Sequence, residues 1–430
     1  MKKKIQYSLI IGVVFMLSSC LGEEKNLFPE SAALRLNNSI ANAKQVLVNQ
    51  SQGNNNGWIM EYFPTNDTEG YTFLMSFNNS KSATIAARNQ YTPVYTTETS
   101  VYDIVGDTGP VLTFDSYNKV FHLFSNPVDP NGGNVGNGLK GDYEFIVLNI
   151  SPDNVITLKG KKRGTTILMR PLAQGQDWKG YFDVLDKMDT TLFGALYPQL
   201  LLQISDNKYI LSNGYTHIFN AKLDGGDPLD VGSNLPFIIT DYGIRLGSPF
   251  IQNEDSTQQF ALNEGKTALV DVKDASITIT PEPISSFINK SSSKYYASQD
   301  DLKGAFLSTF NKMAIEFNTQ YGGRRDLTAI GFRKDNDKFN FLLRAASNEA
   351  IFTIPYTFSS GKITINTFDG NNMASTDMDN NASLFYTAIP SIKEMLTLIQ
   401  GTYDLSSDYP FSYNTIKYTK NNNDYLVVKR

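Results

Sequence analysis

Residues 71–77, Tyr-Thr-Phe-Leu-Met-Ser-Phe, carry the pattern that decides the fold. Tyr71, Phe73, Met75 and Phe77 alternate with smaller or polar neighbours, and this period of two predicts a strand with one buried face. Similar short segments follow along the chain. They lie at 82–87, 111–114, 120–124, 143–150, 155–158 and 165–169. Short antiparallel strands in this number predict a compact barrel or sandwich.

Helical spacing occurs before these strands and again after them. Ala33, Leu36, Ile40, Ala43 and Leu47 recur every three or four residues, which predicts an amphipathic helix over 31–48. The same spacing returns near 178–188, near 302–313 and near 392–399. A capping box at 391–394 is expected to open the last of these helices, and a glycine at 401 to end it.

The chain therefore divides into segments of different character. A signal peptide is expected over 1–19 and a lipidated tether over 20–30, followed by modules over 31–173, 174–290 and 291–430. The predicted fold class is mostly β with a few short helices, a β-rich α+β arrangement of tandem antiparallel barrel- or sandwich-like modules, each preceded by a helix. Residues 109–118 resemble residues 235–243, so a diverged duplication and a chance likeness of two hairpins both stay open.

Composition excludes several classes of site. The chain of 430 residues has 27 Phe and 23 Tyr but only 2 Trp, 2 His and 1 Cys. A single Cys rules out a disulfide framework and Cys-rich metal sites. No cofactor is expected, and neither is a metal site built on histidine.

The N-terminus predicts export and lipidation. Lys2, Lys3 and Lys4 precede a short apolar stretch over 7–17, which is too short to span a membrane and is typical of a secretory signal. The stretch ends in Leu-Ser-Ser-Cys at 17–20, which resembles a bacterial lipobox, so Cys20 is the expected lipidation site. The alternative for Cys20 is a small buried apolar residue.

Glu23 and Glu24 follow the cysteine closely. The pair resembles the signal that sends Bacteroidetes lipoproteins to the outer leaflet of the outer membrane; the alternative is an ordinary solvated linker. Removing the three signal lysines leaves 35 basic against 43 acidic residues, a net charge of −8. Because this surface repels phosphate polymers, no nucleic-acid partner is expected.

Catalytic candidates are few. His122 and His217 are the only side chains able to serve as a base near pH 7, and both stand in strand-like stretches, where we expect structural roles. A carboxylate pair could hydrolyse glycosides without histidine. Asp183 and Asp186 beside Trp178 have a suitable composition, but their spacing is common on a solvated helix face. We expect no catalytic residues and no enzyme activity.

Two further clusters have competing interpretations. Asp-Asn-Asp at 335–337 and Asp-Met-Asp-Asn at 377–380 place oxygen ligands at alternate positions, as calcium prefers, but turn formation explains them more simply. The basic residues Lys159, Lys161, Lys162 and Arg163 fit a solvated hairpin tip better than an anion site.

Two stretches carry a family resemblance, namely 57–64 (Gly-Trp-Ile-Met-Glu-Tyr-Phe-Pro) and 112–118 (Leu-Thr-Phe-Asp-Ser-Tyr-Asn). With the lipobox and the β modules, they resemble a family of Bacteroidetes surface lipoproteins. The resemblance implies an accessory of a SusC/SusD-type nutrient importer, anchored in the outer membrane bilayer and exposed at the cell surface.

The expected function is non-catalytic binding of an oligopeptide or glycan, with peptide favoured because Trp is scarce. The residues that bind the ligand are not identified by the sequence. A structural or adhesive surface lipoprotein is the first alternative, and a carboxylate-based hydrolase is the second.

Overall fold

The computed structural model describes residues 30–53, 55–132, 135–136, 138–194, 198–359, 361–375 and 381–430. The predicted signal peptide, Cys20, Glu23 and Glu24, and the acidic stretch 377–380 lie outside these residues. Within the described ranges, none of the helices combines the length and apolarity needed to cross a membrane.

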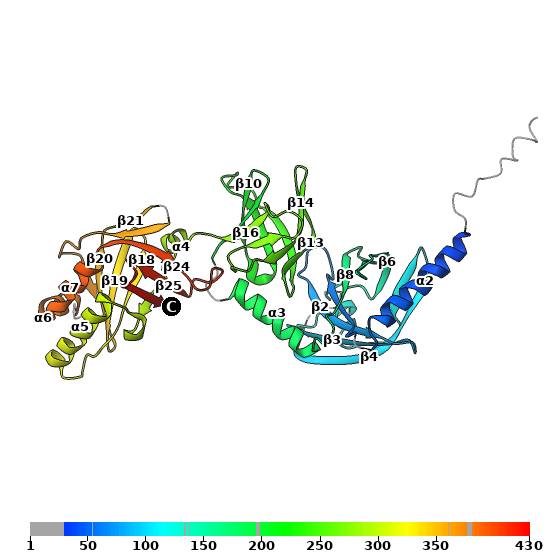
Figure 1. Ribbon diagram of the computed structural model, residues 1–430, viewed down its shortest axis with the longest axis horizontal. Coiled ribbons are helices and arrows are strands. Elements are labelled where there is room, and N and C mark those ends of the chain that lie inside the picture. Colours follow the sequence, from blue (N-terminus) through cyan, green and yellow to red (C-terminus); the bar gives the residue numbers. More distant parts are fainter. Residues whose placement is uncertain are drawn as a thin grey trace, which may run out of the picture.

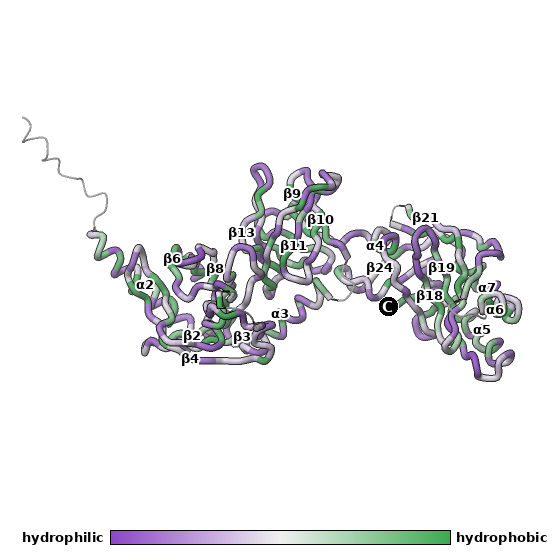
Figure 2. The backbone as a smooth tube through the Cα atoms, turned by 180° about the vertical axis from the view of Figure 1, so that it is seen from behind, coloured by the Kyte–Doolittle hydropathy of each residue, from purple (hydrophilic) through white to green (hydrophobic). Residues whose placement is uncertain are grey.

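Three β-rich modules follow one another along an elongated molecule (Figure 1). Two are closed eight-stranded barrels, and the third is an open sheet of ten strands packed with helices. The predicted fold class, tandem barrel-like modules in a mostly β chain, is therefore confirmed. In Figure 2 the hydrophobic segments concentrate within the modules, whereas the hairpin tip beyond β13 (Gly243–Gln252) is hydrophilic.

Barrel 1 follows helix α2 (Ala32–Asn49), which matches the predicted helix. Ser31 caps this helix, and the carbonyl of Leu47 accepts the indole N–H of Trp58 at 3.0 Å. The strands of barrel 1 are β1 (Trp58–Tyr62), β2 (Tyr71–Phe77), β3 (Ser82–Asn89), β4 (Thr92–Gly106), β5 (Pro110–Phe114), β6 (Glu144–Ile150), β7 (Ile156–Gly160) and β8 (Thr166–Pro171). Each strand pairs with the next, and β8 returns to pair antiparallel with β1.

The predicted strand over 120–124 is wrong. This segment holds the 3₁₀ helix η2 (His122–Ser125), because the side chain of Asn118 accepts the N–H groups of Val120 and Phe121 at 3.1 Å and turns the chain. Phe121 and Phe124 then enter the core of barrel 1, where both rings meet Tyr62 edge-on. The segment therefore fills the barrel rather than extending its wall.

The predicted half-buried character of 71–77 is also wrong. Tyr71, Phe73, Met75 and Phe77 face the core of barrel 1, but the opposite face carries Leu74, which is fully buried. The strand has two covered faces because barrel 2 and its helix pack against the outside of barrel 1.

Barrel 2 follows helix α3 (Trp178–Phe193), which the sequence also predicts. Its elements are β9 (Leu200–Ile204), β10 (Asn207–Ser212), η3 (Gly214–Thr216), β11 (Ile218–Leu223), β12 (Ser233–Ile239), β13, β14 (Asp255–Leu262), β15 (Leu269–Asp271) and β16 (Thr278–Pro281). Pairing of β16 with β9 closes it. The stretches 109–118 and 235–243 that resemble each other fall on the fifth strand of barrel 1 and the fourth of barrel 2, so they do not occupy equivalent positions.

The C-terminal module has a core of its own, built around helix α5 (Ala305–Tyr321). Its other helical elements are α4 (Ile284–Lys290), η4 (Gln299–Asp301), α6 (Asn381–Ala388) and α7 (Pro390–Leu398). Its strands are β17 (Tyr295–Ala297), β18 (Leu327–Asp335), β19 (Lys338–Ala345), β20 (Asn348–Ile354), β21 (Tyr356–Ser359), β22 (Lys362–Ile365), β23 (Met373–Ser375), β24 (Gly401–Ser406), β25 (Thr415–Thr419) and β26 (Tyr425–Lys429). They are arranged in the order β21-β22-β24-β25-β26-β17-β18-β19-β20-β23.

The predicted ends of the last helix are wrong. Pro390 opens α7, so Ser391 lies inside its first turn, and the Ser391 hydroxyl donates instead to Glu316 of α5 at 2.7 Å. Gly401 begins β24 rather than ending the helix, whose cap is Ile399. A proline at the first helical position, which has no N–H to satisfy, starts the helix one residue before the serine.

Candidate functional site

The two barrels are packed together through a buried face. Ile59, Leu74 and Ala86 point outward from the first three strands of barrel 1 and join the core cluster of barrel 2. The backbones come close together at Gly70, whose N–H donates to the carbonyl of Phe237 at 3.1 Å. A Cβ on this glycine would lie 2.6 Å from Ile238.

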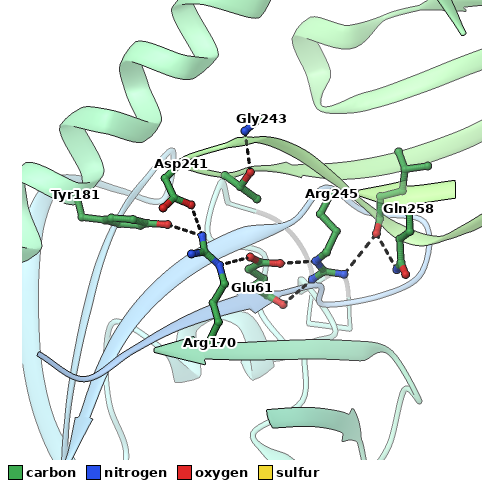
Figure 3. Close-up of polar contacts among 9 residues, drawn as sticks. Glu61, Arg170, Tyr181, Asp241, Gly243, Arg245 and Gln258 are labelled. Atoms are coloured by element: carbon green, nitrogen blue, oxygen red, sulfur yellow. Dashed lines mark hydrogen bonds and ion pairs between the residues drawn. The ribbon is translucent and has the colours of Figure 1, made fainter. Parts of the chain in front are cut away.

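A buried ion network crosses the same face (Figure 3). Glu61 of β1 is 1% exposed and binds Arg245 of β13, which is fully buried. The second carboxylate oxygen of Glu61 accepts from Arg170 of β8 at 2.8 Å, and Arg170 also binds Asp241 and the hydroxyl of Tyr181. The network therefore connects barrel 1, α3 and barrel 2.

The protonation state of Glu61 follows from its partners. Burial alone would raise the pKa of Glu61, but the charges and hydrogen bonds of Arg245 and Arg170 outweigh it and hold that pKa below its ordinary value. The carboxylate therefore stays ionised. Breaking such a pair by removing one partner costs about 3–5 kcal/mol because it leaves a buried charge uncompensated.

A cavity of about 690 Å³ opens beside this joint. Three parts of the chain line it: the β2 and β3–β4 region of barrel 1, the middle of α3, and the β11 and β12 region of barrel 2. The lining residues are Glu69, Gly70, Tyr71, Thr72, Arg88, Asn89, Gln90, Pro93, Leu185, Asp186, Asp189, Tyr215, Thr216, His217, Ile238 and Ile239. We call it the inter-barrel pocket, and it is the candidate site.

His217 stands between two carboxylates on the wall of this pocket. Its Nδ1 lies 3.1 Å from Glu69 of barrel 1, and its Nε2 lies 3.0 Å from Asp189 of α3. Burial lowers the pKa of His217, but the hydrogen bonds and charges of Asp189 and Glu69 outweigh it and raise that pKa to about 9. The imidazolium is therefore charged at neutral pH and fastens α3 and barrel 1 to barrel 2.

Arg88 makes the second fixed contact across the pocket. It reaches from the end of β3 to α3, where it binds Asp183 at 2.7 Å and Asp186 at 2.6 Å. Beside it, the hydroxyl of Tyr71 donates to Glu69 at 2.8 Å, and the amide of Gln90 donates to the same carboxylate oxygen at 2.7 Å. The polar groups on the barrel 1 side are thus held in place by one another.

This geometry is suited to binding. A general base must be unprotonated near the working pH, and His217 is protonated there. Asp186 and Asp189 keep 69% and 43% of their side chains exposed, and Leu185, Ile238 and Ile239 supply an apolar wall. The pocket therefore offers fixed charges and hydrogen-bonding groups beside apolar surface.

The strand prediction is wrong for both histidines. Neither lies in a strand: His122 belongs to η2, and His217 adopts a left-handed conformation (φ 54°) after η3. His122 is buried outside the inter-barrel pocket and accepts the N–H of Asn118 at Nδ1 over 3.0 Å, which agrees with a structural role. The strand prediction failed for His217 because Asn213 is also left-handed and bends the chain on entry to the 3₁₀ turn.

Asp183 and Asp186 lie on an exposed helix face, as expected, but both bind Arg88. Sequence reasoning missed Glu69, Arg88 and Asp189 entirely. These residues are polar surface types without a motif, and they meet only because the barrels pack. One available signal was Glu61, a carboxylate inside an apolar strand pattern, which points to a buried partner.

The other clusters take ordinary structural roles. Asp335 binds Arg333 at 3.1 Å, and Asn336 is left-handed (φ 51°) in the β18–β19 turn, so the turn interpretation is confirmed there. Lys161 in the β7–β8 turn binds Asp107 at 3.1 Å and Glu144 at 3.6 Å. In the part of the chain that the structure covers, no group of three or more His, Cys, Asp or Glu is placed to hold a metal.

Comparison with solved structures finds sliding clamps. The β subunit of DNA polymerase from Streptococcus pyogenes is 9% identical over 92% of this chain and 97% of that one, with a TM-score of 0.13. The DNA polymerase sliding clamp from Caulobacter crescentus is 9% identical over 91% and 96% of the two chains, with a TM-score of 0.14. Scores this low carry no argument about fold or function.

No curated protein matches the chain. A family model described as a domain of unknown function, DUF4302, matches residues 24–264. This range includes barrel 1, α3 and barrel 2 through β14, and with them every residue of the inter-barrel pocket. The chain belongs to the DUF4302 family.

Proposed function

We propose that this chain is a cell-surface lipoprotein that binds a nutrient oligomer in the inter-barrel pocket and works beside a SusC/SusD-type importer without altering a covalent bond. The pocket is the observation that carries the proposal. Its volume of about 690 Å³ falls within the range of about 300–1,000 Å³ typical of ligand sites, and such sites prefer the junction of two domains.

Rigid walls support a binding role. His217, Arg88 and the Glu61 network connect barrel 1, α3 and barrel 2 at several separate points. A site whose groups are fixed before the ligand arrives loses less conformational entropy on binding. The charged state of His217 supports the non-catalytic part of the proposal, because a protonated imidazole cannot act as a general base.

The N-terminal sequence supports the location. Cys20 and the acidic pair Glu23 and Glu24 come shortly before α2, and α2 lies at one end of the elongated molecule (Figure 1). A lipid anchor there would hold barrel 1 nearest the membrane and the C-terminal module farthest from it. Stable attachment needs more than one acyl chain, as bacterial lipoproteins carry.

The location is tested by removing the anchor. Cys20→Ala is expected to move the protein from the outer-membrane fraction to the soluble fraction. Glu23→Ala with Glu24→Ala is expected to keep the protein in the membrane but to protect it from protease added to whole cells. A double variant as accessible to protease as the parent would contradict surface export through these acids.

The binding role is tested by filling the pocket. Equilibrium dialysis against a tryptic protein digest and a mixture of neutral oligosaccharides, read by mass spectrometry, should show retained components with the parent protein. Thr216→Trp, which adds a large ring to an exposed pocket residue, should abolish retention, whereas Thr357→Trp on an exposed strand of the C-terminal module should not. Equal retention by Thr216→Trp and the parent would contradict the proposal.

A further inference from the structure

We propose that the inter-barrel pocket selects basic oligopeptides, taking a lysine or arginine side chain against the α3 carboxylates. This inference rests on the proposed function and names its ligand class. It is carried by the charge of the pocket, by the apolar surface beside that charge, and by an adjoining cavity.

The charges around the pocket leave an excess of negative charge. Four carboxylates belong to its two ion clusters, and among the described residues Arg88 and the charged His217 are the cations paired with them. The four are Glu69, Asp183, Asp186 and Asp189. Two negative charges therefore remain, and the carboxylates of α3 are the exposed ones. A cation entering here is attracted, and an anion is repelled.

Apolar surface lies next to these carboxylates. Leu185 belongs to α3 itself, one residue before Asp186, while Ile238 and Ile239 come from β12. Lysine and arginine place an aliphatic stem on apolar surface while the charged head meets a carboxylate. Tyr215, with 61% of its surface exposed, offers an aromatic ring at the same site, and aromatic rings attract cations.

Charge also distinguishes a basic peptide from a glycan. A basic peptide brings a cation to the carboxylates of α3, whereas a neutral glycan supplies no charge.

An adjoining cavity makes room for a chain longer than one residue. It has a volume of about 160 Å³ and shares Glu69 and Tyr71 with the inter-barrel pocket. Tyr91 and Leu139 add aromatic and apolar surface there. An extended peptide with one basic residue in the larger cavity can place a neighbouring residue in the smaller one.

The test is isothermal titration calorimetry with three synthetic pentapeptides that differ only at two positions, filled by lysine, glutamine or glutamate. At low ionic strength the lysine peptide should bind the full-length protein about tenfold more tightly than the glutamine peptide, and the glutamate peptide should bind most weakly. Raising the salt to about 0.5 M should remove most of the difference.

Matched variants locate the effect. Asp186→Asn with Asp189→Asn should bring the lysine peptide to within about twofold of the glutamine peptide. Asp206→Asn with Asp224→Asn removes the same charge from two exposed turns outside the pocket and should leave the preference intact. Circular dichroism confirms that each variant is folded before titration.

The outcomes separate this inference from the proposed function. If the glutamate peptide or a neutral oligosaccharide bound more tightly than the lysine peptide, and Thr216→Trp abolished that binding, the ligand class would be overturned while the pocket kept its role. Binding of the lysine peptide that survives Thr216→Trp, or no binding of any probe, would overturn the inference.

Discussion

The two joints of the molecule are built from different interactions. Barrel 1 and barrel 2 share a core cluster and an ionised carboxylate, Glu61, buried with two arginines. Barrel 2 and the C-terminal module meet through Phe411, which is buried in the cluster of barrel 2, and through Tyr413, whose hydroxyl donates to the carbonyl of Glu282 at 2.6 Å. The first joint contains a buried ion network. The second combines the apolar contact of Phe411 and a neutral hydrogen bond with one ion pair, Lys290 with Glu282 at 2.7 Å, whose lysine is 60% exposed; we call it the apolar joint.

The difference between the two joints indicates which pair of modules is held in a fixed geometry. The hydrogen bonds within a buried ion pair are directional, so the pair tolerates little misalignment, whereas apolar contacts are non-directional. The inter-barrel pocket lies beside the charged joint, whose rigidity it needs. The apolar joint carries a module that has a core of its own.

The largest expected effect comes from breaking the charged joint. Arg245→Met should destabilise the barrel pair by about 3–5 kcal/mol, because Glu61 then keeps a buried charge with one partner fewer. Tryptophan fluorescence in urea measures this directly, since the only two tryptophans, Trp58 and Trp178, lie in barrel 1 and α3.

The double variant Glu61→Gln with Arg245→Met should recover most of that loss. Lys312→Met, which removes an exposed ion pair in the C-terminal module, serves as the control and should leave the fluorescence transition unchanged. A loss below about 1 kcal/mol in Arg245→Met would mean that the joint does not depend on this charge.

A smaller effect is expected at the apolar joint. Phe411→Ala should cost about 3 kcal/mol, because it leaves a cavity in the cluster shared with barrel 2. Scanning calorimetry should then show the C-terminal module unfolding separately from the barrels. Tyr409→Ala, at an exposed position in the same loop, is the matched control. Unchanged coupling of the transitions in Phe411→Ala would contradict the assignment of the joint.

The smallest expected effect is a loss of about 2 kcal/mol in the free energy of unfolding as the pH rises and His217 loses its proton. Its pKa is raised to about 9 in the folded protein, so its stabilising contribution is complete below pH 6.5 and is lost as the pH rises toward 9. His217→Gln should flatten the decline of unfolding free energy across that window, measured by urea titration at several pH values.

His122 provides the contrast. Burial lowers the pKa of His122, so this residue destabilises the folded state as the pH falls below 6.5. The free energy of unfolding therefore depends on pH with the opposite sign to the contribution of His217. His122→Gln should therefore change the acid side of the stability profile and leave the alkaline side unchanged. An alkaline slope that persists in His217→Gln would show that the imidazolium contact is not its source.

The sequence predicted the local features well, because helical and strand periodicities depend on residues a few positions apart. Helices α2 and α3 and the β-rich modules follow from such patterns. Barrel closure does not, since it depends on β1 meeting β8 across more than a hundred residues. The buried outer face of β2 escaped prediction for the same reason, because its cover comes from another module.

The pocket escaped prediction on physical grounds as well. Glu69, Arg88 and Asp189 have ordinary surface composition, and only packing of the barrels brings them together. The left-handed backbone at His217 depends on a turn that starts at Asn213, next to Gly214. That Asn-Gly pair is the local sequence feature that favours a turn over a strand here.

The pairing of Glu61 with Arg245 also sets an order of events as the chain emerges and folds. The two residues are 184 positions apart, so in a chain that emerges from its N-terminus the arginine becomes available well after the glutamate. Until then, the outward face of the first strands must remain in water, with its carboxylate hydrated and its apolar neighbours uncovered. The emerging chain therefore passes through an interval in which barrel 1 is exposed to misassociation, and this interval ends only when β13 of barrel 2 is available to cover it.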